Sequence, residues 1–335
     1  MRLRWLSSIQ ISLFLLACPV AHAVDLTGAG ASFPYPIYAR WAAQYHKDTG
    51  HRVNYQSIGS GGGQQQIIAG TVDFGATDDP MPQDQLQKHE LLQFPAVIGA
   101  IVPIVNLQGV APGELRLTGP VLADIFLGRI ERWDDPAIAA LNPGLALPAR
   151  DIVVVHRADG SGTTYVWTHY LSQVSPLWAA GVGRGKAIKW PTGHGGKGNE
   201  GVAAYVRQIR NSIGYVEFAY AHQNGLSWTQ LENRAGHFVQ PSQDTFAAAA
   251  LAASDDQTPG MALMLDNQPG AQAWPITSAS FILVRRHPNR SEHNQQVFAF
   301  FDWAFSQGAG MARSLDYVPL PEPLVERIRA LWGAS

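Results

Sequence analysis

The chain has 335 residues, of which 46% are hydrophobic and 15% are charged, with 24 Lys and Arg against 26 Asp and Glu. This length suits one large or two medium domains with a buried core, and the slightly acidic balance without basic runs argues against nucleic-acid binding. The only cysteine is Cys18, which excludes internal disulfides and metal sites built from several cysteines.

The first 23 residues have the layout of a signal peptide. Two arginines precede a short apolar run at residues 11–16, and residues 21–23 (AHA) form a cleavage signal. The run is shorter than the roughly 18 residues that cross a bilayer, so we expect export and cleavage after Ala23. A buried N-terminal helix is the alternative. The sequence LLAC, which ends at Cys18, also fits a lipoprotein signal.

Loss of this leader changes the charge balance. It removes two arginines and no acid, so Lys and Arg fall from 24 to 22 against 26 Asp and Glu, a net charge of −4. Because such a protein repels anions as a whole, an anion site has to be built locally from helix N-termini, backbone N–H groups and one or two cations. We expect the mature chain to be a soluble periplasmic protein without a thiol.

From residue 24 onward, short strand-like runs alternate with glycine-rich turns and helical patterns. This alternation predicts an α/β fold. The first helix should bury Ile37, Trp41 and Tyr45, which share one face. The expected elements of this part are a strand over 24–27, a helix from Pro34 to Gly50, a strand over 52–58, a helix over 64–69 and a strand over 72–76.

Two longer apolar runs, at 94–105 and 274–284, are expected to be buried strands that cross between lobes. We therefore predict a first lobe formed by 24–104 and 278–335, and a second lobe formed by 105–277, with a hinge and a cleft between them. The other expected elements are a helix from Thr118 to Gly128, a strand over 151–156, a helix through Tyr170, a glycine-rich turn over 193–201, and helices over 202–209, 298–305 and 320–332.

Three turns share a pattern that suits anion binding. Each follows a strand, is rich in glycine and places a hydroxyl at a helix start. A helix N-terminus presents unpaired N–H groups and partial positive charge, and glycine lets an anion approach the backbone. Alternatively, each hydroxyl caps its own helix. The residues concerned are Ser32, Ser60, Ser161 and Thr163.

Two charged residues, Arg157 and Asp78, lie at strand ends, and Asp159 follows Arg157 by two residues. Arg157 could grip an oxyanion with two N–H groups while Asp159 holds the guanidinium in place, although such a pair is commonly an exposed surface bridge. Asp78 would repel an anion unless the anion brings a proton to donate, as hydrogen phosphate does and sulfate at neutral pH does not. The alternative for Asp78 is a turn residue before Pro80.

These segments resemble the ligand segments of the periplasmic phosphate-binding proteins of ABC transporters. The four that contain the candidate residues are LTGAGASFP at 26–34, YQSIGSGG at 55–62, VDFGATD at 72–78 and RADGSGT at 157–163. The resemblance continues through WP at 190–191, GGKGN at 195–199, IGYVE at 213–217 and FFDWA at 300–304. It therefore spans nearly the whole mature chain.

The resemblance implies a two-lobed type II periplasmic binding protein fold that closes on a dehydrated phosphate. It implies delivery of phosphate to the transmembrane permease subunits of an ABC importer, by a monomer with no cofactor, metal or catalytic step. The implied phosphate ligands are Ser32, the Phe33 backbone, Ser60 and Asp78 from the first lobe, and Arg157, Ser161, Gly162 and Thr163 from the second, with Asp159 orienting Arg157.

Three positions depart from the family pattern. Ser32 stands where the family often has Thr, which keeps the hydroxyl, and Gly61 replaces a frequent Ser, which we expect to cost little. Asp79 stands where a small residue is common and adds a second negative charge beside Asp78. This charge bears on affinity more than on which ligand binds.

Two rival functions remain to be separated from phosphate binding. A hydrolase is disfavoured because Ile58 and Asp159 stand where a G-x-S-x-G motif needs its first glycine, and residues 193–198 lack the pattern of a P-loop. The histidines show no metal-ligand spacing. Within the binding class, the runner-up is a receptor for another tetrahedral oxyanion such as sulfate, molybdate or phosphonate.

Overall fold

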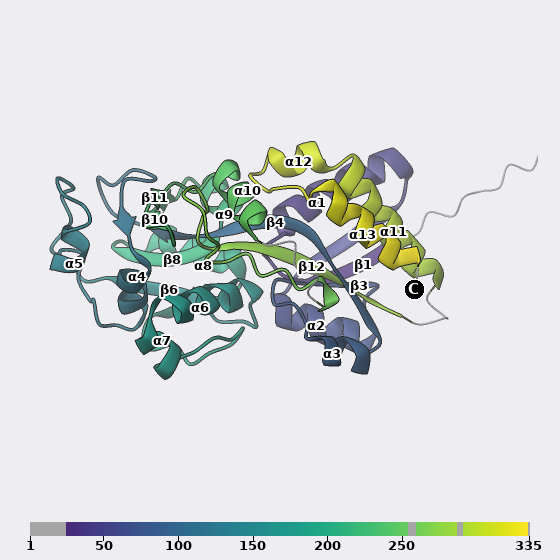
Figure 1. Cartoon of the computed structure of the whole chain (residues 1–335), viewed down its shortest axis with the longest axis horizontal. Helices are drawn as coiled ribbons and strands as arrows, with labels where there is room; N and C mark the ends of the chain where they lie inside the picture. Colours follow the sequence, from purple (N-terminus) through teal and green to yellow (C-terminus); the bar gives the residue numbers. More distant parts are fainter. Residues whose placement is uncertain (1–24, 254–258, 287–290, 334–335) are drawn as a thin grey trace, which may run out of the picture.

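The computed structural model describes residues 25–253, 259–286 and 291–333, which form a two-lobed α/β structure (Figure 1). The expected signal peptide, its cleavage after Ala23 and the possible lipid attachment at Cys18 lie outside the described residues. No helix in the described part of the chain is long and apolar enough to cross a membrane.

One lobe, here called the first lobe, contains both ends of the described chain and lies at the right of Figure 1. Its strands β1, β2 and β3 are parallel and pair in the order β2-β1-β3. Its elements are β1 (Asp25–Gly30), α1 (Tyr35–Thr49), β2 (Arg52–Ser57), α2 (Ser60–Ala69), β3 (Phe74–Thr77), α3 (Gln83–Lys88), α11 (Ser291–Ser306), α12 (Ala309–Arg313) and α13 (Glu322–Gly333).

The second lobe is built from the middle of the chain, at the left of Figure 1. Its strands β8, β6 and β7 are parallel. Its main elements are α4 (Gly119–Phe126), α5 (Pro136–Ala139), β6 (Val153–Arg157), α6 (Gly162–Val174), α7 (Pro176–Gly181), β7 (His194–Gly196), α8 (Gly198–Gln208), β8 (Ser212–Glu217) and α9 (Phe218–Gln223). Smaller elements are β5 (Arg116–Leu117), β9 (Ser227–Trp228), β10 (Gln230–Glu232), β11 (Phe238–Val239) and α10 (Gln243–Ala252). The short 3₁₀ helix η1 (Pro259–Met261) instead packs against α3 of the first lobe.

Two long antiparallel strands, β4 (Leu91–Val105) and β12 (Thr277–Arg285), lie side by side and join the lobes (Figure 1). The first part of β4 pairs with β12, and its last five residues pair with β8 of the second lobe. On its other edge β12 pairs with β3. The two crossing strands predicted from the apolar runs are therefore confirmed, whereas the lobe boundaries at residues 104/105 and 277/278 stay a prediction.

The structure corrects the start of three helices. Helix α2 begins at Ser60, four residues before the predicted start, and α8 begins at Gly198 within the predicted turn. Helix α11 begins at Ser291, seven residues before the predicted start at 298. The glycines at the start of α2 allow close packing: a Cβ added to Gly63 would lie 2.5 Å from Cα of Gly30. Glycine was interpreted as a turn signal, but at this position it lets a helix pack against a strand.

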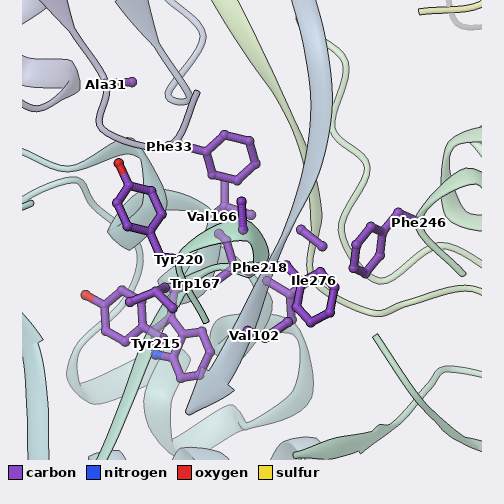
Figure 2. Packing of buried hydrophobic residues seen from close by; sticks show 14 of the residues in the cluster. Ala31, Phe33, Val102, Val166, Trp167, Tyr215, Phe218, Tyr220, Phe246 and Ile276 are labelled. Atoms are coloured by element: carbon purple, nitrogen blue, oxygen red, sulfur yellow. The ribbon is translucent and has the colours of Figure 1, made fainter. Parts of the chain in front are cut away.

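The core of the second lobe supports its strand ends with stacked aromatic rings. Trp167 of α6 and Tyr215 of β8 stack with ring centroids 4.5 Å apart, and both are fully buried (Figure 2). The Tyr215 hydroxyl accepts from the backbone N–H of Arg157 at 3.2 Å and lies 2.6 Å from Oγ1 of Thr164. Core packing therefore fixes both the end of β6 and the start of α6.

Candidate functional site

The candidate residues gather where carboxyl ends of parallel strands from the two lobes meet. Open α/β sheets bind their ligands at these ends, where helix N-termini also point. The loops after β1, β2 and β3 approach the turn between β6 and α6, and Gly61 N–H donates to the Gly160 carbonyl across the interface at 2.8 Å. Each of the following candidates is at most 3% exposed: Ser32, Phe33, Ser60, Asp78, Arg157, Ser161 and Thr163.

Gly162 shows how closely the lobes approach. A Cβ added to this first residue of α6 would overlap the Ser60 hydroxyl and lie 2.7 Å from Cβ of Asp78. Only glycine therefore lets the N-terminus of α6 reach the first lobe in this arrangement. Gly61 is similarly placed, because a Cβ there would lie 3.2 Å from Cα of Gly160.

The three serine hydroxyls differ in how they relate to their helices. Ser161 is the N-cap of α6, and its Oγ accepts from Thr164 N–H at 2.9 Å. Ser60 is not a cap, and its Oγ accepts from the backbone N–H of Asp78 at 3.2 Å. Ser32 also lies outside the capping role, since no side-chain cap bonds to the start of α1. The capping alternative is therefore correct for Ser161 alone.

The side chain and the backbone of Phe33 have different surroundings. Its ring is fully buried (Figure 2) and lies in edge contact with Tyr317, which follows α12. Its carbonyl accepts from the Tyr317 hydroxyl at 2.7 Å, and the neighbouring Ser32 carbonyl accepts from the Tyr220 hydroxyl at 2.7 Å. These bonds anchor the turn on which the predicted backbone contact depends.

Asp78 is an acidic group in a strongly desolvating environment. Burial raises its pKa to about 7, although a hydrogen bond from Ser280 and the charge of Arg157 act in the opposite direction. The Ser280 hydroxyl donates to Oδ1 at 2.8 Å. A carboxyl with this pKa can lose or accept a proton near neutral pH, which suits an acceptor for a protonated anion.

Arg157 is held as predicted by Asp159. Its Nε and Nη2 donate to the two carboxylate oxygens at 2.8 and 2.6 Å. Burial alone would raise the pKa of Asp159, but the bonds and charge of Arg157 bring it below its usual value. The guanidinium is buried, which excludes the surface-bridge alternative, and its Nη1 has no hydrogen-bond partner among the described residues. A buried guanidinium N–H without a protein partner is an expected contact for an anion.

The additional charge of Asp79 is paired across the lobes. Lys186 of the second lobe places Nζ 3.0 Å from Oδ2 of Asp79, and it also donates to Oε1 of Gln64. The Gln64 amide in turn donates to the Asp79 carbonyl at 2.9 Å. The second carboxylate is therefore compensated when the lobes are together, which the sequence alone did not indicate.

Two supporting residues were missed by the sequence analysis, and each lacks a local signal. Lys186 lies in an irregular segment and reaches Asp79 only through the fold. Ser280 lies in β12, where the register against β4 shifts between Ser280 and Phe281 opposite Pro95. Because Thr277 and Ser278 lie in the same strand, Ser280 does not stand out in the sequence.

The fold and this site define a class of protein: a two-lobed type II periplasmic binding protein. A family model described as a PBP superfamily domain matches residues 19–307. A crystal structure of a phosphate-binding protein from Stenotrophomonas maltophilia is similar with a TM-score of 0.68 and 18% sequence identity, over 92% of this chain and 94% of that one. At this identity the likeness concerns the fold.

Relatives with similar sequences identify the family within this class of binding proteins. The chain is 60% identical over 327 residues to the phosphate-binding protein PstS of Pasteurella multocida, covering 98% of this chain and 94% of the relative. It is also 60% identical to the phosphate-binding protein PstS of Haemophilus influenzae, covering 94% of each chain. The chain belongs to the PstS family of phosphate-binding proteins. The family resemblance expected from the sequence is thereby confirmed.

Proposed function

We propose that the protein binds inorganic phosphate between its lobes and delivers it to the transmembrane permease subunits of an ABC importer. The proposed ligands are the eight residues identified from the sequence, with Asp159 orienting Arg157. The observation that carries the proposal is the pairing of one buried guanidinium, whose Nη1 lacks a partner among the described residues, with one buried carboxyl of near-neutral pKa. Hydrogen phosphate offers acceptor oxygens to the guanidinium of Arg157 and a proton to the carboxyl of Asp78.

This arrangement favours phosphate over sulfate for a chemical reason. The Ser60 and Ser161 oxygens each accept one hydrogen bond from a backbone N–H group, and each keeps a proton that it can donate. An ionised Asp78 among these donors is a hydrogen-bond acceptor. An anion that carries a proton can donate it to Asp78, whereas a fully deprotonated anion is repelled by the charge of the carboxylate.

Calorimetric titration of the purified protein with phosphate and with sulfate tests the proposal. We expect tight binding of phosphate and at least a hundredfold weaker binding of sulfate, about 2.7 kcal/mol. Tight binding of sulfate, molybdate or a phosphonate without a response to phosphate would reject it. Release of product from a phosphomonoester would contradict the further proposal that the protein performs no chemistry.

The remaining parts of the proposal concern cell location and movement. We propose export to the periplasm with cleavage after Ala23, function as a monomer, and closure of a lobe formed by 24–104 and 278–335 onto one formed by 105–277. The mass of the mature N-terminus distinguishes simple cleavage from lipid attachment at Cys18. Small-angle scattering with and without phosphate measures both the mass of the particle and its change in size.

A further inference from the structure

The side chain of Asn199 contacts a candidate ligand residue from each lobe. Asn199 is the second residue of α8 and is fully buried. Its backbone N–H and Nδ2 both donate to Oγ of Ser32, at 3.1 and 2.8 Å. The same Nδ2 lies 3.4 Å from Oγ1 of Thr163. One amide group thus reaches a hydroxyl of the first lobe and a hydroxyl of the second.

The backbone of Glu217 fixes which way this amide points. Its N–H donates to Oδ1 of Asn199 at 2.9 Å, and a backbone N–H has no capacity to accept. If the amide were reversed, this buried N–H would face another donor and lose its partner, which is costly. The oxygen of Asn199 therefore faces Glu217, and its nitrogen faces Ser32 and Thr163.

The orientation of Asn199 determines the role of the Ser32 hydroxyl. A serine oxygen has one proton to donate and two positions at which it accepts. Both accepting positions of Ser32 are occupied by N–H groups of Asn199. Its proton must therefore be donated to a third group, and in the proposed site that group is an oxygen of the anion.

We propose that Asn199 is a positioning residue that makes Ser32, and through a longer contact Thr163, a donor to the bound anion. Because Asn199 belongs to the second lobe and Ser32 to the first, Asn199 directs the proton of the Ser32 hydroxyl toward the anion only when the lobes are closed. The inference rests on the proposed phosphate binding and extends it to a residue outside the predicted ligands. A freely rotating hydroxyl can donate or accept, whereas this one presents its proton to an acceptor.

A double-mutant cycle measured by calorimetry with phosphate tests the inference. We expect Asn199→Ala to weaken binding about tenfold when Ser32 is present, because the hydroxyl loses an accepted bond and its fixed direction. In the Ser32→Ala background the same change should weaken binding by less than about threefold, since there is no hydroxyl to orient. Equal losses in the two backgrounds would show a merely structural role and overturn the inference.

Asn106→Ala provides a matched control at the other end of the same helix. The Asn106 amide donates to the carbonyls of Val206 and Arg207, near the end of α8 and away from the candidate ligands. This variant should lower thermal stability yet leave the phosphate dissociation constant within about twofold of wild type. A loss as large as that of Asn199→Ala would mean that any disturbance of α8 weakens binding, and would overturn the inference.

Asn199→Asp keeps the shape of the side chain and serves if the alanine variant does not fold. Its Oδ1 still accepts from Glu217, but its second oxygen attracts the Ser32 proton away from the anion. Repulsion between the introduced carboxylate and the anion acts with or without Ser32, so the inference requires the loss to be larger when Ser32 is present. Equal losses would refute it. If wild type fails to bind phosphate the proposed function is wrong, and the same cycle is then measured with sulfate.

Discussion

The hydroxyl of Ser280 donates a hydrogen bond of 2.8 Å to Oδ1 of Asp78 and joins the crossing strand β12 to the end of β3. The bond stabilises the ionised form of Asp78 and opposes the effect of burial on its pKa. It also gives Oδ1 of Asp78 a partner within the protein. The pKa of Asp78 therefore depends on a strand that links the two lobes.

Asp78→Asn should reduce the preference for phosphate over sulfate. The asparagine amide can donate, so a fully deprotonated anion no longer meets an acceptor alone. We expect the ratio of the two dissociation constants to fall by at least tenfold, or about 1.4 kcal/mol. Calorimetric titration with both anions measures the ratio, and an unchanged ratio would remove Asp78 from the site.

The stability of the unliganded protein should depend on pH through Asp78. Its pKa is about 7 when folded and near 3.8 when unfolded, so the folded state binds more protons between these values. The free energy of unfolding therefore decreases as the pH rises from about 4 to 7, with a limit of roughly 4 kcal/mol from this group. Buried Glu217, whose pKa burial also raises, contributes in the same direction.

Denaturant unfolding of wild type and Asp78→Asn across this pH range isolates the effect of Asp78. The free energy of unfolding of the variant minus that of wild type should increase with pH up to about 7 and then level off, since the variant has no carboxyl to ionise there. Parallel curves would show that Asp78 has an ordinary pKa when folded.

Arg157→Ala should weaken phosphate binding by at least about 2 kcal/mol, because the desolvated anion loses its charged partner. Arg157→Lys keeps the charge but loses the planar group that Asp159 holds, so we expect an intermediate effect. Arg129→Ala is the control, since Arg129 is exposed and forms a surface pair with Asp124. Titration calorimetry compares the three variants, and a change of a few tenths of a kcal/mol in Arg157→Ala would place the guanidinium outside the site.

Lys186→Met should weaken phosphate binding by uncovering the charge of Asp79 next to the site. The side chains are partly exposed, so we expect a modest loss of about 0.5–1 kcal/mol that diminishes at high salt. Adding Asp79→Asn should restore most of the affinity, because the uncompensated charge disappears. No recovery in the double variant would show that Lys186 acts through its packing or through Gln64 instead.

Gly162→Ala should hinder closure, since the added Cβ would overlap the Ser60 hydroxyl of the other lobe. We expect phosphate binding to weaken at least tenfold, about 1.4 kcal/mol, because the lobes close less completely. Gly181→Ala, at the end of α7 with open space around it, is the matched control. Calorimetry and small-angle scattering give the affinity and the phosphate-dependent compaction, and wild-type behaviour in both would refute the prediction.

The parts of the site that the sequence predicts are local. Ser32, Ser60 and Arg157 belong to strand, turn and helix patterns within a few residues, and parallel strands bring such ends together. Asp159 was also predictable, because it lies two residues from the arginine that it holds. The α/β fold and its two crossing strands follow from the same alternation of apolar runs and turns.

The remaining parts depend on contacts between distant segments. Ser280 lies 202 residues from Asp78, and Lys186 lies 107 residues from Asp79, so no local pattern signals either pair. The early start of α2 was missed because its glycines were interpreted as a loop, while their role is to let that helix pack closely against β1. Such packing is determined by the tertiary structure, which overrides the low helix propensity of glycine.

The burial of Ser60, Ser161 and Thr163, all with no exposed surface, has a kinetic consequence. We expect an anion held by these groups to leave when the lobes separate, so that the rate of lobe separation limits its dissociation rate. Ligands of different affinity therefore share the same maximum dissociation rate. A permease that pulls the lobes apart would therefore shorten the residence time of the anion without touching the anion itself.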